Sequence, residues 1–379
     1  MLNDLHNNQI HYNDLISYIR LVRTPNIGPI TFYHLLKLYK TPQNAIYALE
    51  ALLKGTLKTC HQIKEIYPID KAKKEIEDTH KIGAKIITIF EASYPKMLRN
   101  INDSPPIITA LGNHSLLQED TIAIVGSRYP SINGKNFAYK LSYDISKLGF
   151  ITVSGLAKGI DKSVHSVISK NFPTIAVMAS GINIVYPKEN LHLYKDIAQN
   201  GGLVLTELPF AALPKAQLFP QRNRIISGLS LGIVVVEASK KSGSIITANL
   251  ALSQGREVFA VPGSPLDIRY SGCNNLIKNG AKLVESATDI IEGIKFNYNS
   301  LQTKLIYNNN IINNNEEQNT TKNDIKKFIL QQLSTSPTSI EELFNLTSFN
   351  INEVLAAITE LEISKKIEKL PNHNIALIL

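Results

Sequence analysis

Cysteine is scarce in this sequence. Only Cys60 and Cys273 occur among its 379 residues, far apart and without CxxC spacing. Two such residues predict neither a disulfide framework nor a thiolate metal site, so a disulfide-stabilised miniprotein is excluded. We expect a protein of a reducing compartment that holds no metal.

Long apolar runs are also missing. No uninterrupted apolar stretch reaches the roughly 18 residues of a membrane span, and residues 1–10 mix Asn, Asp and His with apolar side chains. We therefore expect a cytoplasmic protein with no membrane partner. Hydrophobic residues (44%) and charged residues (19%) occur as in ordinary globular proteins. At roughly 150 residues per domain, two or three folded domains are predicted.

Positive charge is in moderate excess, with 40 Lys and Arg against 32 Asp and Glu. The net charge of +8 favours an anionic partner, although solubility alone also explains it. Arginine accounts for only 8 of the 40 cations, and Arg128, Arg222 and Arg224 fall beside glycine-rich turns. Because a guanidinium can bind phosphate through two parallel hydrogen bonds, these three are candidates for an anion site.

The first 80 residues are predicted to form a helical domain, because apolar residues recur there at helical spacing. Residues 23–30 contain Pro25, Gly28 and Pro29 and predict a tight turn between two helices. The amides of such a hairpin can contact a nucleic-acid phosphate, and a purely structural turn is the equal alternative.

Residues 81–296 change to short runs rich in Ile and Val, each followed by a glycine-rich turn and an amphipathic segment. This order predicts β-α-β units, and the missing period-2 alternation predicts strands covered by helices on both faces. The predicted strands are residues 122–125, 151–153, 175–178, 203–205, 233–236 and 258–261, and the predicted helices are residues 136–147, 162–169, 189–198, 222–227, 245–253 and 274–278. The fold class is α/β, with a doubly wound parallel sheet.

The rest of the chain predicts a linker and a small third domain. Residues 297–321 are dominated by Asn, Gln and Thr and are too polar to form a core, which is typical of a flexible linker. Residues 322–379 show helical patterns at 325–333, 340–344 and 351–361, then a hairpin at 367–379 with its turn at 371–374. Three helices and a hairpin predict a winged helix.

Ligands of an open parallel sheet bind outside the carboxyl ends of its strands, where this sequence places its glycine-rich turns. Four turns hold the candidate binding residues: Gly126, Ser127 and Arg128; Ser154, Gly155, Lys158 and Gly159; Arg222, Asn223 and Arg224; and Lys240, Ser242 and Gly243. The first two place a guanidinium and an ammonium group among backbone amides that can bind phosphate. Neither GxxxxGK[ST] nor a GxGxxG after the first strand is present, so a Walker-type nucleoside triphosphatase and the usual dinucleotide fold are not supported.

In combination, these turns make residues 90–290 similar to the DNA processing protein A family, also called DprA or Smf. The resemblance implies an extended Rossmann fold that forms a homodimer, binds single-stranded DNA in a basic pocket at the strand ends and hands it to the RecA recombinase. By motif position, Arg128 and Lys158 would hold phosphates, with Ser127, Gly155 and Gly159 as backbone neighbours. The two ends of the chain resemble the family's SAM-like or helix-hairpin-helix domain and its winged helix.

The resemblance leaves the roles of two residues undecided, Arg224 and Asn183. The resemblance implies that Arg222 and Asn223 shape the same pocket, with Arg224 as either a pocket residue or a structural one. At residues 178–183 the family usually has a second glycine and an aspartate ahead of Tyr186, so the turn is expected to differ and the role of Asn183 is undecided.

Several residues have a structural alternative to a chemical role. Asp161 and His165 lie four apart on a predicted helix and suit a general acid-base pair, but we favour Asp161 as a helix cap and His165 as a local packing residue. Cys273 has no flanking histidine and does not predict a nucleophile. For Lys240 a solvated turn is favoured. The aromatic residues that suit either base stacking or packing, with packing favoured, are Tyr129, Phe137, Tyr186 and Phe219.

Three functions are compatible with the sequence. The leading hypothesis is a single-stranded DNA-binding mediator without catalytic residues or cofactor, which loads RecA during DNA uptake and transformation or during repair. The second is a nucleotide-phosphate-processing enzyme of the lysine decarboxylase-like group, but residues 242–248 lack the glutamate of its PGGxGTxxE string. The third is a duplex-DNA regulator acting through the winged helix, whose six lysines against seven acidic residues instead favour protein contact.

Overall fold

The computed structural model describes residues 12–53, 63–294 and, with gaps, 325–377. The chain forms two compact units, residues 1–296 and 297–379. The domain boundary predicted at residue 80 lies inside the first unit and stays a prediction, and the linker predicted at 297–321 lies outside the described residues. None of the helices in the described part of the chain has the length and apolarity to cross a bilayer.

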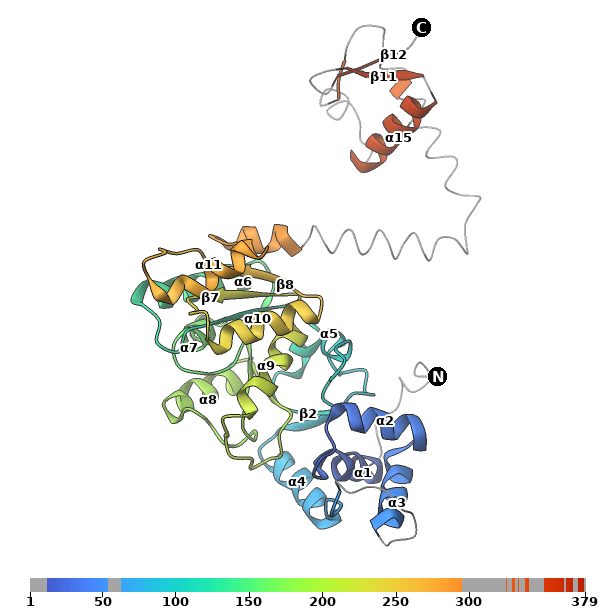
Figure 1. Ribbon diagram of the computed structural model, residues 1–379, viewed down its shortest axis with the longest axis vertical. Helices are drawn as coiled ribbons and strands as arrows, with labels where there is room; N and C mark the ends of the chain where they lie inside the picture. Colours follow the sequence, from blue (N-terminus) through green and yellow to red (C-terminus); the bar gives the residue numbers. More distant parts are fainter. Residues whose placement is uncertain are drawn as a thin grey trace. The chain divides into compact units, whose positions relative to one another are not determined.

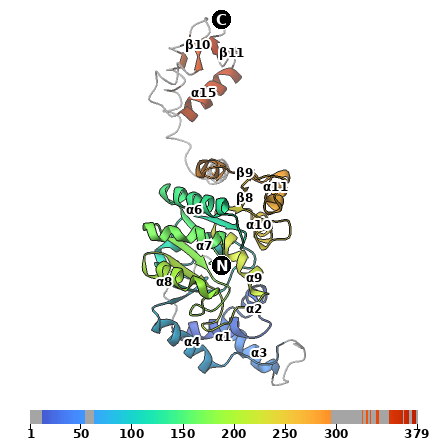
Figure 2. The same cartoon turned by 90° about the vertical axis from the view of Figure 1, so that its left-hand side faces the viewer.

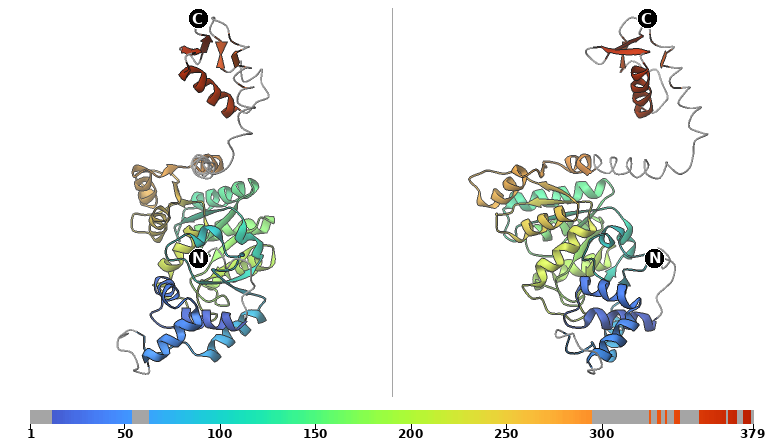
Figure 3. Two further views of the ribbon diagram at one scale, coloured as in Figure 1. Left: turned by 90° about the vertical axis from the view of Figure 1, so that its right-hand side faces the viewer. Right: turned by 45° about the vertical axis from the view of Figure 1, so that its right-hand side comes forward.

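Four helices begin the first unit and gather at one end of it, drawn in blue (Figures 1 and 3). They are α1 (Tyr12–Arg23), α2 (Pro29–Tyr39), α3 (Pro42–Leu53) and α4 (Ile69–Lys81). The turn predicted at 23–30 separates α1 from α2, which starts with Pro29, where a missing N–H costs nothing. Phe32 and Ile46 are fully buried between these helices, so the predicted helical spacing is confirmed.

A nine-stranded sheet forms the centre of the first unit, in the order β1-β2-β6-β5-β4-β3-β7-β8-β9. The strands are β1 (Lys85–Thr88), β2 (Ile107–Gly112), β3 (Thr121–Gly126), β4 (Ile151–Ser154), β5 (Thr174–Val177), β6 (Leu203–Thr206), β7 (Gly232–Val236), β8 (Glu257–Ala260) and β9 (Lys282–Leu283). From β6 to β9 all neighbours are parallel, as predicted for the six strands β3 to β8; β9 was not predicted. The pairs β1/β2 and β2/β6 are antiparallel, so the sheet is mixed at one edge, where no strand was predicted.

Helices cover both faces of the parallel part (Figure 2). They are α5 (Lys96–Arg99), α6 (Ile132–Lys147), α7 (Ile160–His165), α8 (Leu191–Gln199), α9 (Leu218–Leu229), α10 (Gly243–Ser253) and α11 (Ser271–Lys278). In β3, Ile122 and Ile124 pack against α6 and α7, whereas Ala123 and Val125 pack with residues of α9 and α10 on the other face. Burial of both faces explains why the strands read as continuous apolar runs.

All six predicted helices differ from the observed bounds by a few residues, and two of these differences affect the site. The helix predicted at 222–227 begins at Leu218, so Arg222 lies in its second turn instead of at its start. The helix predicted at 162–169 is the short α7, which continues as a 3-10 turn over Ser166–Lys170. The N-cap of α7 is Gly159, so the prediction that Asp161 caps this helix is wrong.

The second unit contains α15 (Ile351–Ile363) and a three-stranded antiparallel sheet. Its strands are β10 (Thr338–Ser339), β11 (Ile367–Leu370) and β12 (Asn374–Leu377). The predicted hairpin is present as the β11/β12 pair, and Ile329, Ile358 and Ile375 meet in one core. Residues 341–344 of the predicted second helix and 371–373 of the predicted turn lie outside the described residues.

Candidate functional site

The order of the strands creates a crevice between β3 and β7. These strands are parallel neighbours, but the helices that follow them, α6 and α10, cover opposite faces of the sheet. The loops therefore diverge at this switch point, where open α/β sheets bind their ligands. A cavity of about 900 Å³ lies there, which we call the crevice. It is lined by the predicted site residues Gly126, Ser127, Arg128, Arg222, Asn223, Ser242 and Gly243, among others.

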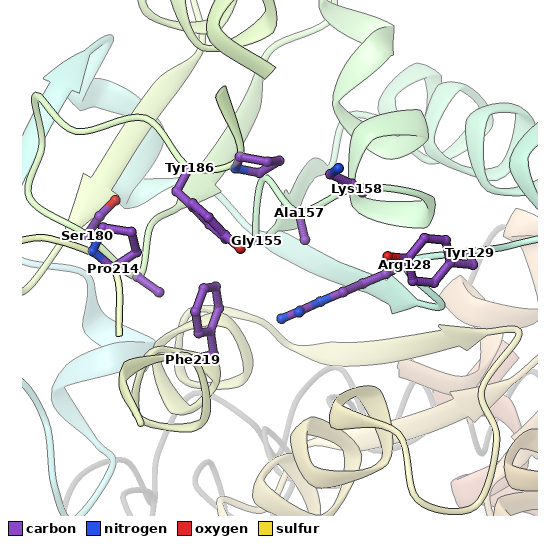
Figure 4. A pocket seen from close by; sticks show the side chains of 11 residues that line it. Arg128, Tyr129, Gly155, Ala157, Lys158, Ser180, Tyr186, Pro214 and Phe219 are labelled. Atoms are coloured by element: carbon purple, nitrogen blue, oxygen red, sulfur yellow. The ribbon is translucent and has the colours of Figure 1, made fainter. Parts of the chain in front are cut away.

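Arg128 and two aromatic residues form one wall of the crevice. The Arg128 guanidinium lies 5.0 Å from the centre of the Phe219 ring, and Phe219 meets Tyr186 edge to face at a centroid distance of 5.7 Å. Figure 4 shows the Arg128 side chain reaching toward Phe219. A cation held against a ring in this way keeps its N–H edge available for a further acceptor. Sequence patterns did not reveal this pairing, although Phe219 and Tyr186 were both considered for stacking.

Lys158 comes close to Arg128 because two loops touch. Gly159 has φ +79°, and a Cβ there would fall 2.3 Å from the Ser127 carbonyl oxygen, so only glycine allows this approach. The Ile160 amide donates to that same oxygen at 3.1 Å. Arg128 and Lys158 consequently line one small cavity of about 140 Å³, which we call the inner hollow (Figure 4).

Lys158 is half exposed and already has an anionic partner. Its Nζ donates to Glu189 Oε1 at 2.8 Å, and this contact raises the pKa of Lys158 and lowers the pKa of Glu189. Glu189 is exposed as well, so water competes for both groups. Glu189 was not among the predicted site residues, since nothing in its local sequence distinguishes it from a surface glutamate.

The Arg222 side chain points into the protein and contacts the loop that contains Gly155 and Lys158. The side chain is buried, and its Nη1 donates to the carbonyl oxygens of Gly155 and Val177. Burial lowers the pKa of Arg222 to about 10, and the nearby Asp161 carboxylate offsets part of that effect. The guanidinium therefore stays charged at neutral pH and holds the turn at Gly155 in place.

Asp161 completes this support. Its Oδ2 accepts from the amides of Gly155 at 3.1 Å and Ala157 at 3.3 Å. Burial raises the pKa of Asp161, whereas Arg222 acts in the opposite direction. Asp161 and Arg222 thus fix the backbone that carries Lys158.

Six predicted residues do not line the crevice: Gly155 and Lys158 line the inner hollow, Gly159 lies in the same loop, and the other three line neither cavity. Ser154 is fully buried and donates to the Ile124 carbonyl at 2.7 Å. Arg224 pairs with Glu207 and lies 3.5 Å from an Asp103 oxygen, which favours the structural alternative for this arginine. Lys240 is exposed on the turn before α10, outside the lining of the crevice, as expected for a solvated turn.

No acid-base pair forms at Asp161 and His165. His165 is fully buried, with Nδ1 2.9 Å from Thr174 Oγ1, and burial lowers its pKa to about 3. The local packing role predicted for His165 is confirmed. Cys273 is also buried, which raises its pKa to about 11 and removes the thiolate that a nucleophile requires.

The turn that departs from the family pattern closes one side of the inner hollow. Ser180 lines the hollow and donates to the Ile184 carbonyl at 2.6 Å. A Cβ at Gly181 would fall 2.0 Å from the Phe210 carbonyl oxygen, so this glycine is needed for close packing. Asn183 is exposed, and its role stays open.

Comparison with known proteins covers all three parts of the chain. The family model of DNA recombination-mediator protein A matches residues 85–295, a DprA-like N-terminal HHH domain matches 13–77, and a DprA winged helix domain matches 315–373. DNA processing protein DprA of Bacillus subtilis is 43% identical over 234 residues, 61% of this chain and 78% of that protein. Protein Smf of Synechocystis is 33% identical over 315 residues, 76% of this chain and 79% of that protein.

Two solved structures of DNA processing protein A are similar to this chain. The X-ray structure of DprA from Streptococcus pneumoniae has a TM-score of 0.54 and 35% identity, covering 70% of this chain and 98% of that one. DNA processing protein A from Helicobacter pylori, studied for its single-stranded DNA binding mode, has a TM-score of 0.51 and 27% identity, covering 58% and 98%. The predicted Rossmann-like fold, N-terminal helix-hairpin-helix domain and winged helix are confirmed. The chain belongs to the DNA recombination-mediator protein A family, that of DprA and Smf.

Proposed function

We propose that this protein binds single-stranded DNA in the crevice and the adjoining inner hollow, with Arg128 and Lys158 on its phosphates. The observation that carries the proposal is the contact between Arg128 and Phe219, which puts a cation and an aromatic ring side by side in one cavity. Phosphates bind the cation while unpaired bases stack on nearby rings. The proposed contact surface also includes Gly126, Ser127, Gly155, Gly159, Asn223, Ser242 and Gly243.

A single strand suits this surface better than a duplex does. Tyr129 is 82% exposed and Tyr186 is 49% exposed, and rings so exposed can be covered by a base only when that base is free of its partner. The Helicobacter pylori relative, studied in its single-stranded DNA binding mode, supports the same choice.

Membership of this family suggests what the protein does with the bound strand. We propose that the protein acts as a homodimeric mediator in the cytoplasm and loads RecA onto incoming DNA during transformation or onto strands at repair sites. A mediator must accept any sequence, and contacts with phosphates and ring faces carry no base identity. Light scattering on the full chain at micromolar concentration should give twice the monomer mass, and a strictly monomeric mass would contradict the dimer.

We further propose that the protein is not an enzyme. Among the described residues that line the crevice, Asp161 is the only carboxylate, and it is buried and bonded to two loop amides. A nucleotide-phosphate-processing enzyme needs a carboxylate free to move a proton. Incubation with nucleoside monophosphates should leave them intact, and release of free base or phosphate would favour the enzymatic alternative.

Filter binding with single-stranded and duplex DNA at two salt concentrations tests the main proposal. We expect tighter binding of the single strand at both concentrations and a loss of affinity with rising salt. Preference for the duplex would instead favour a regulator acting through the winged helix. For RecA loading, filament assembly on strands covered by a single-strand-binding protein should accelerate with the parent and not with the double variant Arg128→Ala, Lys158→Ala.

A further inference from the structure

A second basic cavity, of about 390 Å³, lies beside the crevice, and we call it the outer hollow. It shares Arg128 and Tyr129 with the crevice and with the inner hollow. Lys135 and Lys162 line the outer hollow but neither of the other two cavities. Arg128 and Tyr129 therefore stand where the cavities meet, and a strand leaving the crevice across them would enter the outer hollow.

The fold holds the parts of the outer hollow in place. Lys135 is in the first turns of α6, whose N-cap Ser131 accepts from the Gly134 amide at 2.9 Å. Asn190 is buried, and its Nδ2 donates to the carbonyl oxygens of Leu156 at 2.8 Å and Ala157 at 3.1 Å. This amide ties the loop that carries Lys158 to the segment that carries Glu189. These hydrogen bonds hold the backbone around the outer hollow, whereas its charged side chains are exposed.

The charges in the outer hollow are unbalanced. Arg128, Lys135, Lys158 and Lys162 face a single carboxylate, that of Glu189. Glu189 bonds Lys158, and Lys162 also helps to lower the pKa of Glu189. One carboxylate among four cations occupies the position that an external anion would take, and a phosphodiester offers the same two-oxygen acceptor.

We propose that the outer hollow is a second phosphate-binding subsite for the same DNA strand, in which Lys135 and Lys162 contact phosphates and a phosphate displaces Glu189 from Lys158. This inference rests on the proposed function. It adds contacts beyond Arg128 and Lys158 and gives the strand a direction, from the crevice over Tyr129 toward α6 and α7.

The test compares two double variants on strands of two lengths. Lys135→Ala, Lys162→Ala removes both proposed contacts, and Lys140→Ala, Lys170→Ala removes two exposed lysines outside the hollow. On oligothymidylate of about 20 nucleotides, longer than typical sites of about 4–16, the first variant should flatten the slope of log affinity against log salt by about 1.4. On about 4 nucleotides, which the crevice alone can hold, it should bind like the parent, and the control should match the parent at both lengths.

A third variant, Glu189→Gln, should change the affinity in the opposite direction. Removing the competing carboxylate should tighten binding of the long strand by up to about fivefold, because exposed ion pairs are weak. Unchanged or weaker binding by this variant, or a slope for Lys135→Ala, Lys162→Ala equal to that of the control, would overturn the second subsite.

Failure of the proposed function looks different. If Arg128→Ala, Lys158→Ala binds single strands as tightly as the parent, the crevice is not the DNA site and both proposals fall. If that variant loses affinity while Lys135→Ala, Lys162→Ala behaves as the control, only the outer hollow is excluded.

Discussion

Arg222 lies directly against the backbone of Gly155: a Cβ placed on Gly155 would come within 2.4 Å of the Arg222 Nη1 atom. The close approach lets Nη1 reach the Gly155 carbonyl oxygen. A glycine in the loop and an arginine from α9, 67 residues further along the chain, are therefore required together.

Gly155→Ala should destabilise the fold, because the added methyl group must displace a buried guanidinium. Overpacking of this kind costs about 1–3 kcal/mol, so thermal denaturation should show a melting temperature lower by several degrees. Gly243→Ala is the matched control, since no atom lies within 4 Å of a Cβ at that position. Equal melting temperatures for the two variants would contradict the support assigned to Arg222.

Arg128→Ala, Lys158→Ala should weaken single-strand binding equally on all base sequences. Each lost phosphate contact flattens the slope of log affinity against log salt by about 0.7. The slope of the double variant should therefore be flatter than that of the parent by about 1 to 1.5. Both side chains are exposed, and stability should change by only about 0.5 kcal/mol. Filter binding and thermal denaturation measure the two effects. A variant that melts like the parent and keeps its slope and affinity would show that these residues do not hold DNA.

Phe219→Leu separates stacking from charge. Loss of the ring removes the surface that supports Arg128 and can stack on a base, a contact typically worth about 1–3 kcal/mol per base. Affinity should fall by about fivefold or more while the salt slope stays near that of the parent. Phe219→Tyr keeps the ring and should bind nearly as the parent does. A flatter slope for the leucine variant would mean that the ring acts only by positioning Arg128.

Stability should decrease on acidification because of His165. Burial lowers its pKa to about 3, so between the unfolded value near 6.5 and pH 3 only the unfolded chain takes up this proton. The free energy of unfolding should then fall by about 2 kcal/mol between pH 7 and pH 5 through this residue. Urea denaturation at the two pH values should show a smaller decrease in the free energy of unfolding for His165→Gln than for the parent. The control His34→Gln changes an exposed residue and should show the same decrease as the parent.

The sequence was sufficient to predict the parallel strands and the position of Arg128 and Lys158 in turns at the strand ends. Strand ends of a parallel sheet lie at one edge, so glycine-rich turns after successive runs must come together. The edge strands β1 and β2 were missed, although residues 86–87 and 107–110 contain short isoleucine-rich runs, because pairing direction depends on partners far along the chain.

The inward orientation of Arg222 was missed as well, yet a signal existed. Arg222 stands three, four and seven residues before Ile225, Ile226 and Leu229, which form the apolar face of α9. This spacing places Arg222 on the same face of α9 as the three buried residues. The pairing of Arg128 with Phe219 had no comparable signal, because it depends on how two loops approach in space.

The antiparallel edge of the sheet also limits how the chain can be divided. Ile86 of β1 and Ile107 of β2 share one core with Ile16 and Ile19 of α1 and with Ile76 of α4. A fragment cut at residue 81 would uncover these isoleucines beside a strand edge, a combination that promotes aggregation. Protein engineering on this scaffold should therefore keep the helical domain and the sheet in one piece, from the start of α1 onward.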